Sequence, residues 1–579
     1  MPPPTSKAWN YFKRTADSKT VKCKLCETEL TYTGGTTNML NHLRLKHNTG
    51  IEHENTPQKQ PSMAEFVRSP RSRHLSGTKA EEITRAIVNM VVQDYMPLRI
   101  VEGSGFKNLM SLIAPEYSVP SRNTIKARID KVYDEEKSKL LVELRDVETV
   151  ALTTDTWTSN STTSYITVTE HHIDKNWEMK SNVLVTREMP ERHTGDNLAE
   201  KIKSCVSEFE LGGKVTDVVH DNARNMNAAG EKCPDWNDEN CFGHTLQLCI
   251  KPALEINSVS KLIARSRKLV GHFKHSTTIT AEMRNRQKMF NLPQHELIQD
   301  VPTRWNSTQL MLERLVEQRR VITDVMLDTS VTKKSDAYML LKDSEWEAAS
   351  ELSSVLYHLT KVTTYMSTES CVSASVTYPI VCGLLQKHLG SDDDDSPLIT
   401  KVKETIAGEL RSRFAPYDIE TASTTPVVAS FLDPRHKHLS YMSAAQRQSI
   451  EETIESLLEE VPLKPAASNA LCAPKKPKVQ RVLDFLIDNN ESSSESEVAM
   501  YKRDRIDPEV DPLEWWKTYS SKYPRLSVLA HRYLAVPGTS VPSERIFSTA
   551  GLILTKLRNR LSPSCVDKII FRNKNKLSE

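Results

Sequence analysis

The stretch VALTTDTW, at Val150–Trp157, is the first of four segments that decide the fold of the middle of the chain. It is rich in β-branched residues, which fit the pleated surface of a sheet, and polar residues bound it. The other three segments have the same character and are YITVTEHHI (Tyr165–Ile173), MKSNVLVT (Met179–Thr186) and VTDVVHD (Val215–Asp221). The sequence therefore predicts four strands between residues 150 and 221.

Helical patterns flank these strands. In the runs Ile83–Tyr95 and Ile125–Leu144, apolar residues recur at helical spacing, which predicts a small all-α unit that ends before Asp146. The helical period returns after Cys241 and persists in patches to about residue 460. The predicted fold class is therefore a multidomain α+β protein, in agreement with a length of 579 residues.

Two polar stretches divide the chain. Residues 51–77 contain three prolines and little apolar periodicity, which predicts a linker. Residues 462–506 include the run NNESSSESE (489–497), whose acidic and serine side chains cannot build a core, and this predicts a disordered linker. The second stretch also holds PKKPKV (Pro474–Val479), a short basic run that resembles a nuclear localisation signal.

Composition excludes several protein classes. The mean hydropathy is −0.48, and no stretch approaches the roughly 20 apolar residues that span a bilayer. The opening residues MPPPTSKAWN lack the apolar core of a secretory signal, which predicts a cytosolic or nuclear protein with no membrane partner. Ten cysteines in such a chain are expected to be reduced thiols and metal ligands rather than disulfides.

The first 50 residues carry a strong chemical signal. They contain eight Lys and Arg against three Asp and Glu, whereas the net charge of the whole chain is only +2, and a basic module suits the phosphates of DNA. Two residues separate two cysteines, fifteen separate the pairs and four separate two histidines in the set Cys23, Cys26, His42 and His47. This spacing is typical of a zinc site, and it predicts one structural Zn²⁺ per chain.

A module of this size cannot fold on its apolar core, so zinc must supply much of its folding free energy. Aromatic residues precede the cysteines, an arrangement that resembles the BED-type zinc finger: Trp9, Tyr11 and Phe12. If the histidine-bearing helix docks in the major groove, Asn38 and Asn41 reach base edges, although simple solvation of the helix is the alternative role for both. The basic residues expected at phosphates are Arg44, Lys46, Lys22 and Lys24.

Three acidic residues form a second candidate site. Asp155 ends the first predicted strand, Asp221 ends the fourth, and Glu544 lies far away in VPSERIF. Two aspartates at strand ends with a distant glutamate on a helix are how an RNase H-like nuclease holds two Mg²⁺ or Mn²⁺ ions, because these ions prefer oxygen ligands. Ordinary turn chemistry is the alternative for an aspartate at a strand end.

Motifs along nearly the whole chain resemble the hAT transposase superfamily, in particular the transposase-derived BED zinc-finger proteins that include the DREF-like group. After the finger they are TTDTWTS (153–159), HDNARNM (220–226), CFGH (241–244), TRWNS (303–307), FLDPRHK (431–437), PLEWW (512–516) and SVPSERIFSTAGLILTKLRNRLSP (540–563). The last of these motifs is highly specific.

The resemblance implies an RNase H-like α/β core that a helical insertion interrupts and a C-terminal dimerisation segment completes. The expected domains are a BED-type finger at 1–50, a linker at 51–77, an α-helical DNA-binding unit at 78–146, the first part of the core at 147–255, the helical insertion at 256–461, a disordered linker at 462–506 and the hAT C-terminal dimerisation region at 507–579.

The resemblance also assigns site residues. The family's catalytic triad corresponds to Asp155, Asp221 and Glu544. Its Cys-x-x-His and Arg-Trp pairs, which are associated with the DNA strand and a flipped base near the cleavage point, correspond to Cys241, His244, Arg304 and Trp305. Without the resemblance, Cys241 and His244 would be ordinary residues of a helix face, and Trp305 would be a buried anchor.

Two functions remain open at this point. The first is a nuclear, zinc-dependent, dimeric DNA-binding protein that regulates transcription or chromatin and uses the transposase body as a scaffold. The second is an active transposase that cuts and joins double-stranded DNA with two metal ions. A SUMO ligase activity is described for some relatives, but the sequence has no ring-like zinc pattern beyond the finger.

Overall fold

The computed structural model describes residues 6–17, 19–47, 75–159, 162–368, 372–462, 496–554 and 561–575. It forms two compact units, residues 1–76 and residues 77–579. The basic run Pro474–Val479, together with most of both predicted linkers, lies outside the described residues. In the part of the chain that is described, no helix is both long and apolar enough to cross a membrane.

The N-terminal unit is a small three-stranded sheet with one helix. Its strands form an antiparallel sheet in the order β1-β2-β3. Its elements are η1 (Lys7–Asn10), β1 (Phe12–Arg14), β2 (Thr20–Cys23), β3 (Glu29–Thr31) and α1 (Thr37–His47). Gly34 precedes α1 with φ +99°, a left-handed conformation that favours glycine. The buried apolar residues are few, so this unit has little hydrophobic stabilisation: Ala8, Phe12, Val21, Cys23, Met39 and Leu43.

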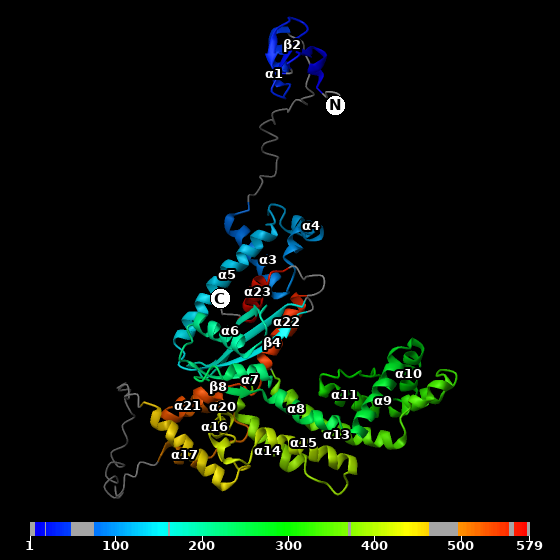
Figure 1. Cartoon of the computed structure of the whole chain (residues 1–579), viewed down its shortest axis with the longest axis vertical. Helices are drawn as coiled ribbons and strands as arrows, with labels where there is room; N and C mark the ends of the chain where they lie inside the picture. The colour runs from blue at the N-terminus through cyan, green and yellow to red at the C-terminus, as the bar shows by residue number, and fades with distance from the viewer. Residues whose placement is uncertain are drawn as a thin grey trace, which may run out of the picture. The chain divides into compact units, whose positions relative to one another are not determined.

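The second unit is built around a five-stranded sheet in the order β6-β5-β4-β7-β8 (Figure 1). β4, β5 and β6 pair antiparallel, whereas β7 and β8 run parallel to β4. The strands are β4 (Val150–Thr158), β5 (Ser164–Ile173), β6 (Met179–Glu188), β7 (Val215–His220) and β8 (Asn237–Asn240). The four predicted strands are confirmed. β8 was not predicted because its sequence NDEN is short and entirely polar.

Both faces of the sheet are covered, so β4 and β5 are buried except for the last three residues of β4 and the first of β5. On one face, Leu152 and Ile166 join a core with α5 (Arg122–Arg145) and α6 (Gly195–Glu208). On the other face, the C-terminal helices α21 (Pro524–Leu534) and α22 (Val541–Ile553) pack against β4 and β5. α7 (Arg224–Gly230) contacts β8, whereas α3 (Gly77–Gln93) and η2 (Leu98–Glu102) contact α5, and α4 (Ser104–Ile113) contacts η2.

A helical region follows the sheet and divides between two cores. The first core joins helices between Phe242 and Phe414. The second joins α16 (Thr425–Leu432) and α17 (Ala444–Glu460) to helices of the C-terminal region, and its member Trp516 is fully buried. The elements are α8 (Phe242–Leu254), α9 (Asn257–Lys274), α10 (Thr277–Met289), α11 (Trp305–Glu317), α12 (Arg319–Leu327), η3 (Lys334–Met339), α13 (Asp343–Met366), η4 (Ala374–Val376), α14 (Thr377–Gly383), η5 (Leu384–His388), α15 (Pro397–Phe414), η6 (Ile419–Ser423), α16 (Thr425–Leu432), α17 (Ala444–Glu460), α19 (Glu497–Arg503) and α20 (Pro512–Tyr519).

The last helix, α23 (Pro563–Lys574), closes the edge of the sheet beside α5 (Figure 1). Asp567 accepts a hydrogen bond from the backbone N–H of Thr186 at 2.6 Å, and Asn575 bonds both backbone groups of Val183 at 2.7 Å. These side chains bond backbone groups of two residues of the edge strand β6, and these groups otherwise would be unpaired. The C-terminal helix therefore covers the edge of the sheet and adds no strand to it.

Candidate zinc finger and acidic site

The finger brings its four sequence-predicted ligands together. Cys23 and Cys26 lie at and just after the end of β2, and His42 and His47 lie on α1. The Sγ atom of Cys26 is 3.2 Å from Nε2 of His42, and Sγ of Cys23 is 3.6 Å from Nε2 of His47. All four ligand atoms lie within 4.8 Å of one another. A tetrahedral zinc with bonds of roughly 2.0 to 2.3 Å requires ligand atoms this close, so the donor set fits structural Zn²⁺.

The local environment of the finger favours a thiolate. The Oγ1 atom of Thr28 is 3.2 Å from Sγ of Cys26, and hydrogen bonding with Thr28, assisted by His47 and His42, lowers the pKa of Cys26 to about 6. Because the thiolate is the form that binds a metal, this environment prepares the site for Zn²⁺.

The face of α1 that is turned away from the finger core is exposed. Asn38, Asn41 and Arg44 lie on it, opposite the buried residues Met39 and Leu43. The remaining predicted phosphate contacts are Lys46 and Lys24, which are exposed, and Lys22, which is half-buried and lies 3.4 Å from Glu27. The predicted DNA-contacting residues of the helix are thus available to a ligand.

The acidic residues come from three elements of the second unit. Asp155 lies on β4 with 8% of its surface exposed, Asp221 directly follows β7, and Glu544 lies in the first turn of α22. β4 and β7 are parallel neighbours, so the carboxyl ends of both strands lie side by side at the same end of the sheet. The negative charges of Asp221 and Glu544, after the larger effect of burial, raise the pKa of Asp155 to about 7. The charges of Asp221 and Glu544 therefore act on Asp155, but the three carboxyl groups are not a set whose ligand atoms all lie within 4.8 Å of one another. We refer to these three residues as the acidic cluster.

Hydrogen bonds that sequence patterns did not reveal hold α22 against the sheet. The hydroxyl of Ser543, next to Glu544, is 2.7 Å from the hydroxyl of Thr153, two residues before Asp155. Thr153 and Thr169 also pair, at 2.5 Å, across β4 and β5. All three hydroxyl residues are fully buried or nearly so. The signal for these bonds in the sequence was that Thr153 and Thr169 lie within strands that also contain apolar residues. A threonine buried on a sheet needs a hydrogen-bonding partner.

Cys241 and His244 lie beside Glu544. Cys241 is 1% exposed and immediately precedes α8, and His244 is in the first turn of α8. Nδ1 of His244 is 3.8 Å from Oε1 of Glu544. Interaction with Cys241, and then the charges of Glu544 and Asp155, raise the pKa of His244 to about 9 against the opposing effect of burial. The pair predicted as DNA contacts thus borders the acidic cluster.

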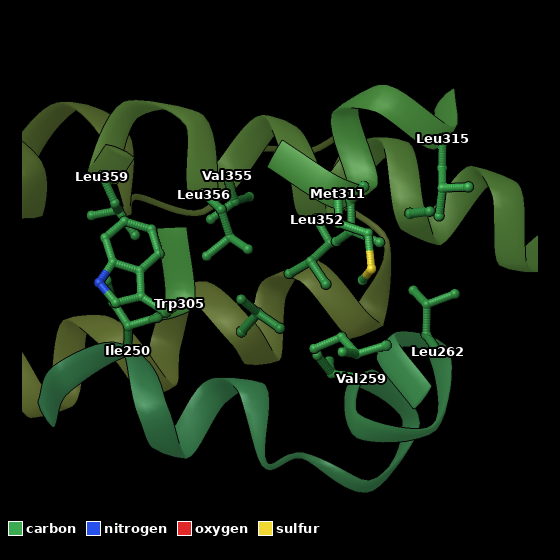
Figure 2. Close-up of a cluster of buried hydrophobic side chains, with 14 of the residues drawn as sticks. Ile250, Val259, Leu262, Trp305, Met311, Leu315, Leu352, Val355, Leu356 and Leu359 are labelled. Atoms are coloured by element: carbon green, nitrogen blue, oxygen red, sulfur yellow. The ribbon is translucent and has the colours of Figure 1, made fainter. Parts of the chain in front are cut away.

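The Arg-Trp pair is split between surface and core. Arg304 is exposed at the start of α11, whereas Trp305 is only 6% exposed and packs among apolar side chains such as Ile250 and Leu359 (Figure 2). The burial of Trp305 fits the alternative role of a buried anchor, and its contact with DNA stays a prediction. Arg304 is the accessible member of the pair.

Four family models match the chain. They are the BED zinc finger at residues 6–48, the ZBED1 RNase-like domain at 153–234, the ZBED1 RNase-like helical domain at 239–355, and the hAT family C-terminal dimerisation region at 494–575. Their order is the order of the finger, the sheet, the helical region and the C-terminal helices in the structure.

Similar proteins span much of the chain. The human "Zinc finger BED domain-containing protein 4" is 26% identical over 98% of this chain and 51% of its own length. The "Putative AC transposase" of Zea mays is 26% identical over 83% of this chain and 63% of its own length. The "Putative transcriptional regulator tpeD" of Talaromyces stipitatus is 21% identical over 98% of this chain and 71% of its own length. The chain thus spans about half of the human relative and less than two thirds of the maize one.

The finger with its zinc-ligand set and the three hAT-type regions agree with these similarities. The chain therefore carries a BED zinc finger, ZBED1 RNase-like regions and a hAT C-terminal dimerisation region, and it is similar to BED zinc-finger proteins and to hAT transposases.

Proposed function

We propose that the protein acts in the nucleus as a zinc-dependent, dimeric DNA-binding regulator of transcription or chromatin. The observation that carries this proposal is the gathered set of two thiols and two imidazoles beside an exposed, polar and basic helix face. A two-cysteine, two-histidine finger that docks its helix in the major groove would place Asn38 and Asn41 at base edges. Arg44 and Lys46 would then contact phosphates.

The C-terminal match to a dimerisation region supports a dimer. Two fingers on one dimer bind two half-sites, and the second binding event becomes intramolecular. Dimerisation would therefore convert one weak finger contact into a stable and selective one. The fungal relative that is named as a transcriptional regulator supports a regulatory role, and nuclear DNA is the ligand that such a role requires.

The test is DNA binding by the intact protein and its Cys26→Ser variant, measured on a randomised duplex library and then on the selected sequence. We expect the variant to lose selection and most affinity, because the finger cannot close around zinc. Cys249→Ala, a buried cysteine of α8 far from the finger in sequence, is the matched control and should bind as wild type does. Unchanged selection by Cys26→Ser would assign recognition to another part of the chain, such as the helices α3 to α5.

A second candidate function is active transposition. It is favoured by the placement of Asp155 on β4, of Asp221 directly after the parallel neighbour β7, and of Glu544 on α22, which packs against β4. A regulator that never cuts DNA has no chemical need for three carboxylates in one cluster. These residues would hold two Mg²⁺ or Mn²⁺ ions, which activate water and stabilise a leaving 3′-oxygen when bound. The residues suit these ions chemically, because Mg²⁺ and Mn²⁺ prefer oxygen ligands and all three side chains are carboxylates.

Strand cleavage and strand transfer on terminal inverted repeats, with Mg²⁺ or Mn²⁺, test this candidate. The control is Asp155→Asn, which keeps the shape of the side chain and removes a metal-binding charge. Activity that this substitution abolishes would reject the scaffold role of the body. Equal products from wild type and variant, or no products from either, would leave regulation as the supported function.

A further inference from the structure

A thiol, an imidazole and a carboxylate meet where the N-terminus of α8 faces the N-terminus of α22. The ligand atoms of Cys241, His244 and Glu544 all lie within 4.8 Å of one another. Cys241 is buried, and the other two residues are half-buried, so the cluster is open on one side. Nδ1 of His244 is buried and makes no hydrogen bond of ordinary length in the described part of the chain.

The backbone around these three side chains is already fixed. The N–H of Cys241 donates to the carbonyl of His220 at 2.8 Å, at the end of β7. The N–H of Ser540 donates to Sγ of Cys241 at 3.3 Å, and the hydroxyl of Ser540 is 3.4 Å from Oε1 of Glu544. Hydrogen bonds from outside the set therefore orient the donor atoms, as supporting residues do at metal centres.

The donor types indicate which ion would bind. Mg²⁺ takes oxygen ligands in octahedral geometry, and a thiolate and an imidazole suit it poorly. Zn²⁺ accepts sulfur, nitrogen and oxygen together, and sites with three protein ligands leave its fourth position open. The separation of 3.8 Å between Nδ1 of His244 and Oε1 of Glu544 needs only a small contraction to fit a tetrahedral edge of about 3.3 Å.

We propose that Cys241, His244 and Glu544 form a second Zn²⁺ site in this protein, with three protein ligands and one open position. The charges of a thiolate and a carboxylate balance those of the ion, so the filled site is electrically neutral. The site stands on the body of the protein and does not depend on the finger or on whether the protein cuts DNA. It raises the expected content from one zinc per chain to two.

Glu544 would then serve two sites. Zinc bound to Cys241 and His244 withdraws this carboxylate from the Mg²⁺ or Mn²⁺ ions that Asp155 and Asp221 would hold. This part of the proposal rests on the second candidate function above. Because Glu544 is withdrawn in this way, free zinc should inhibit any cleavage activity. The inhibition should be weaker in Cys241→Ser.

Zinc content of the full-length protein, measured after gel filtration in metal-free buffer, tests the site. We expect two zinc ions per chain in wild type, one in Cys26→Ser, one in Cys241→Ser and none in the double variant. Cys249→Ala is the control on the same helix, and it should keep both ions. One zinc in wild type that Cys241→Ser does not change would overturn the proposal, and Cys241, His244 and Glu544 would then hold no metal.

Cobalt substitution keeps the test decisive if Cys241→Ser folds poorly. In the Cys26→Ser background, Co²⁺ added to the folded body should give a thiolate-to-cobalt charge-transfer band. The Glu544→Gln variant should retain this band, because the sulfur ligand is unchanged, while Co²⁺ binds more weakly. His244→Ala should lose it. No charge-transfer band in folded Cys26→Ser protein would also overturn the proposal. Failure of the finger to bind DNA would leave both results unaffected.

Discussion

The finger is assembled from residues that are close together in the sequence, whereas the acidic cluster is assembled from residues that are far apart in it. The four ligands of the finger lie within 25 residues, Cys23 to His47, and the metal itself closes the unit. Asp155 and Glu544 are separated by almost the whole body, and they meet only because α22 packs on β4. A metal-closed site needs little surrounding structure, whereas a site made from distant elements requires the complete fold. The two regions should therefore respond to different perturbations.

Chelation of zinc should have the largest effect, and the unfolding that it causes should be confined to the finger, because the body keeps its hydrophobic cores when the proposed second ion is removed. Structural zinc contributes about 10–16 kcal/mol of apparent binding free energy in finger peptides, far more than the small core of this unit can replace. A strong chelator should therefore unfold residues 6–47 while the sheet of the body stays protected. Hydrogen exchange by mass spectrometry, read separately for the finger and for β4 to β7, measures both. If β4 to β7 also lost their protection from hydrogen exchange at the same chelator concentration, the two regions would not respond differently, and this prediction would be wrong.

Phe571→Ala should have the converse effect, on the body alone. Phe571 is fully buried on α23, and its ring centroid lies 5.0 Å from that of Tyr133 on α5. Truncation of a buried phenylalanine costs about 3–5 kcal/mol, so the free energy of unfolding of the body should fall by that amount. Chemical denaturation followed by tryptophan fluorescence measures it. Phe571→Leu should lose much less, and zinc binding by the finger should be unchanged in both variants.

Substitutions on α1 should separate sequence choice from general affinity for DNA. Asn38→Ala should relax the preferred base at one position by about 1–3 kcal/mol, because a bidentate contact to adenine is lost. Arg44→Ala should weaken binding to all sequences alike and reduce the salt dependence of binding by about one phosphate contact. Competition binding at several salt concentrations distinguishes the two. If Asn38→Ala leaves the preference unchanged, this asparagine only solvates the helix.

The smallest expected effect is a pH dependence of the body. His172 is buried beside Glu170, and although burial opposes its charge, the hydrogen bond and charge of Glu170 raise the pKa of His172. A raised pKa in the folded state means that the stabilisation is fully present below the unfolded pKa. It is lost as the pH rises through the folded pKa. Denaturation midpoints should therefore fall over this range in wild type, and they should not do so in His172→Gln. A rise in stability over the same range would refute this role for the pair.

The sequence predicted the parts whose signals are local. Ligand spacing identified Cys23, Cys26, His42 and His47, and β-branched segments identified the four main strands. The polar strand β8 was missed, because a short strand at the edge of a sheet needs no apolar side chains. Trp305 was assigned to DNA by resemblance, although its burial depends on helices that are distant in sequence. Spacing alone could not indicate that Ser543 bonds Thr153, since 390 residues separate them.

The closure of the sheet edge by α23 has a consequence for how the protein is made. The finger is complete once His47 has left the ribosome, whereas β6 acquires its partners Asp567 and Asn575 only after more than 500 further residues have been synthesised. At about 5–20 residues per second, this interval lasts roughly half a minute to two minutes. During that time the nascent chain can already capture zinc while its sheet still has an open edge. A chaperone that covers exposed strands would act on this protein late, on the body and not on the finger.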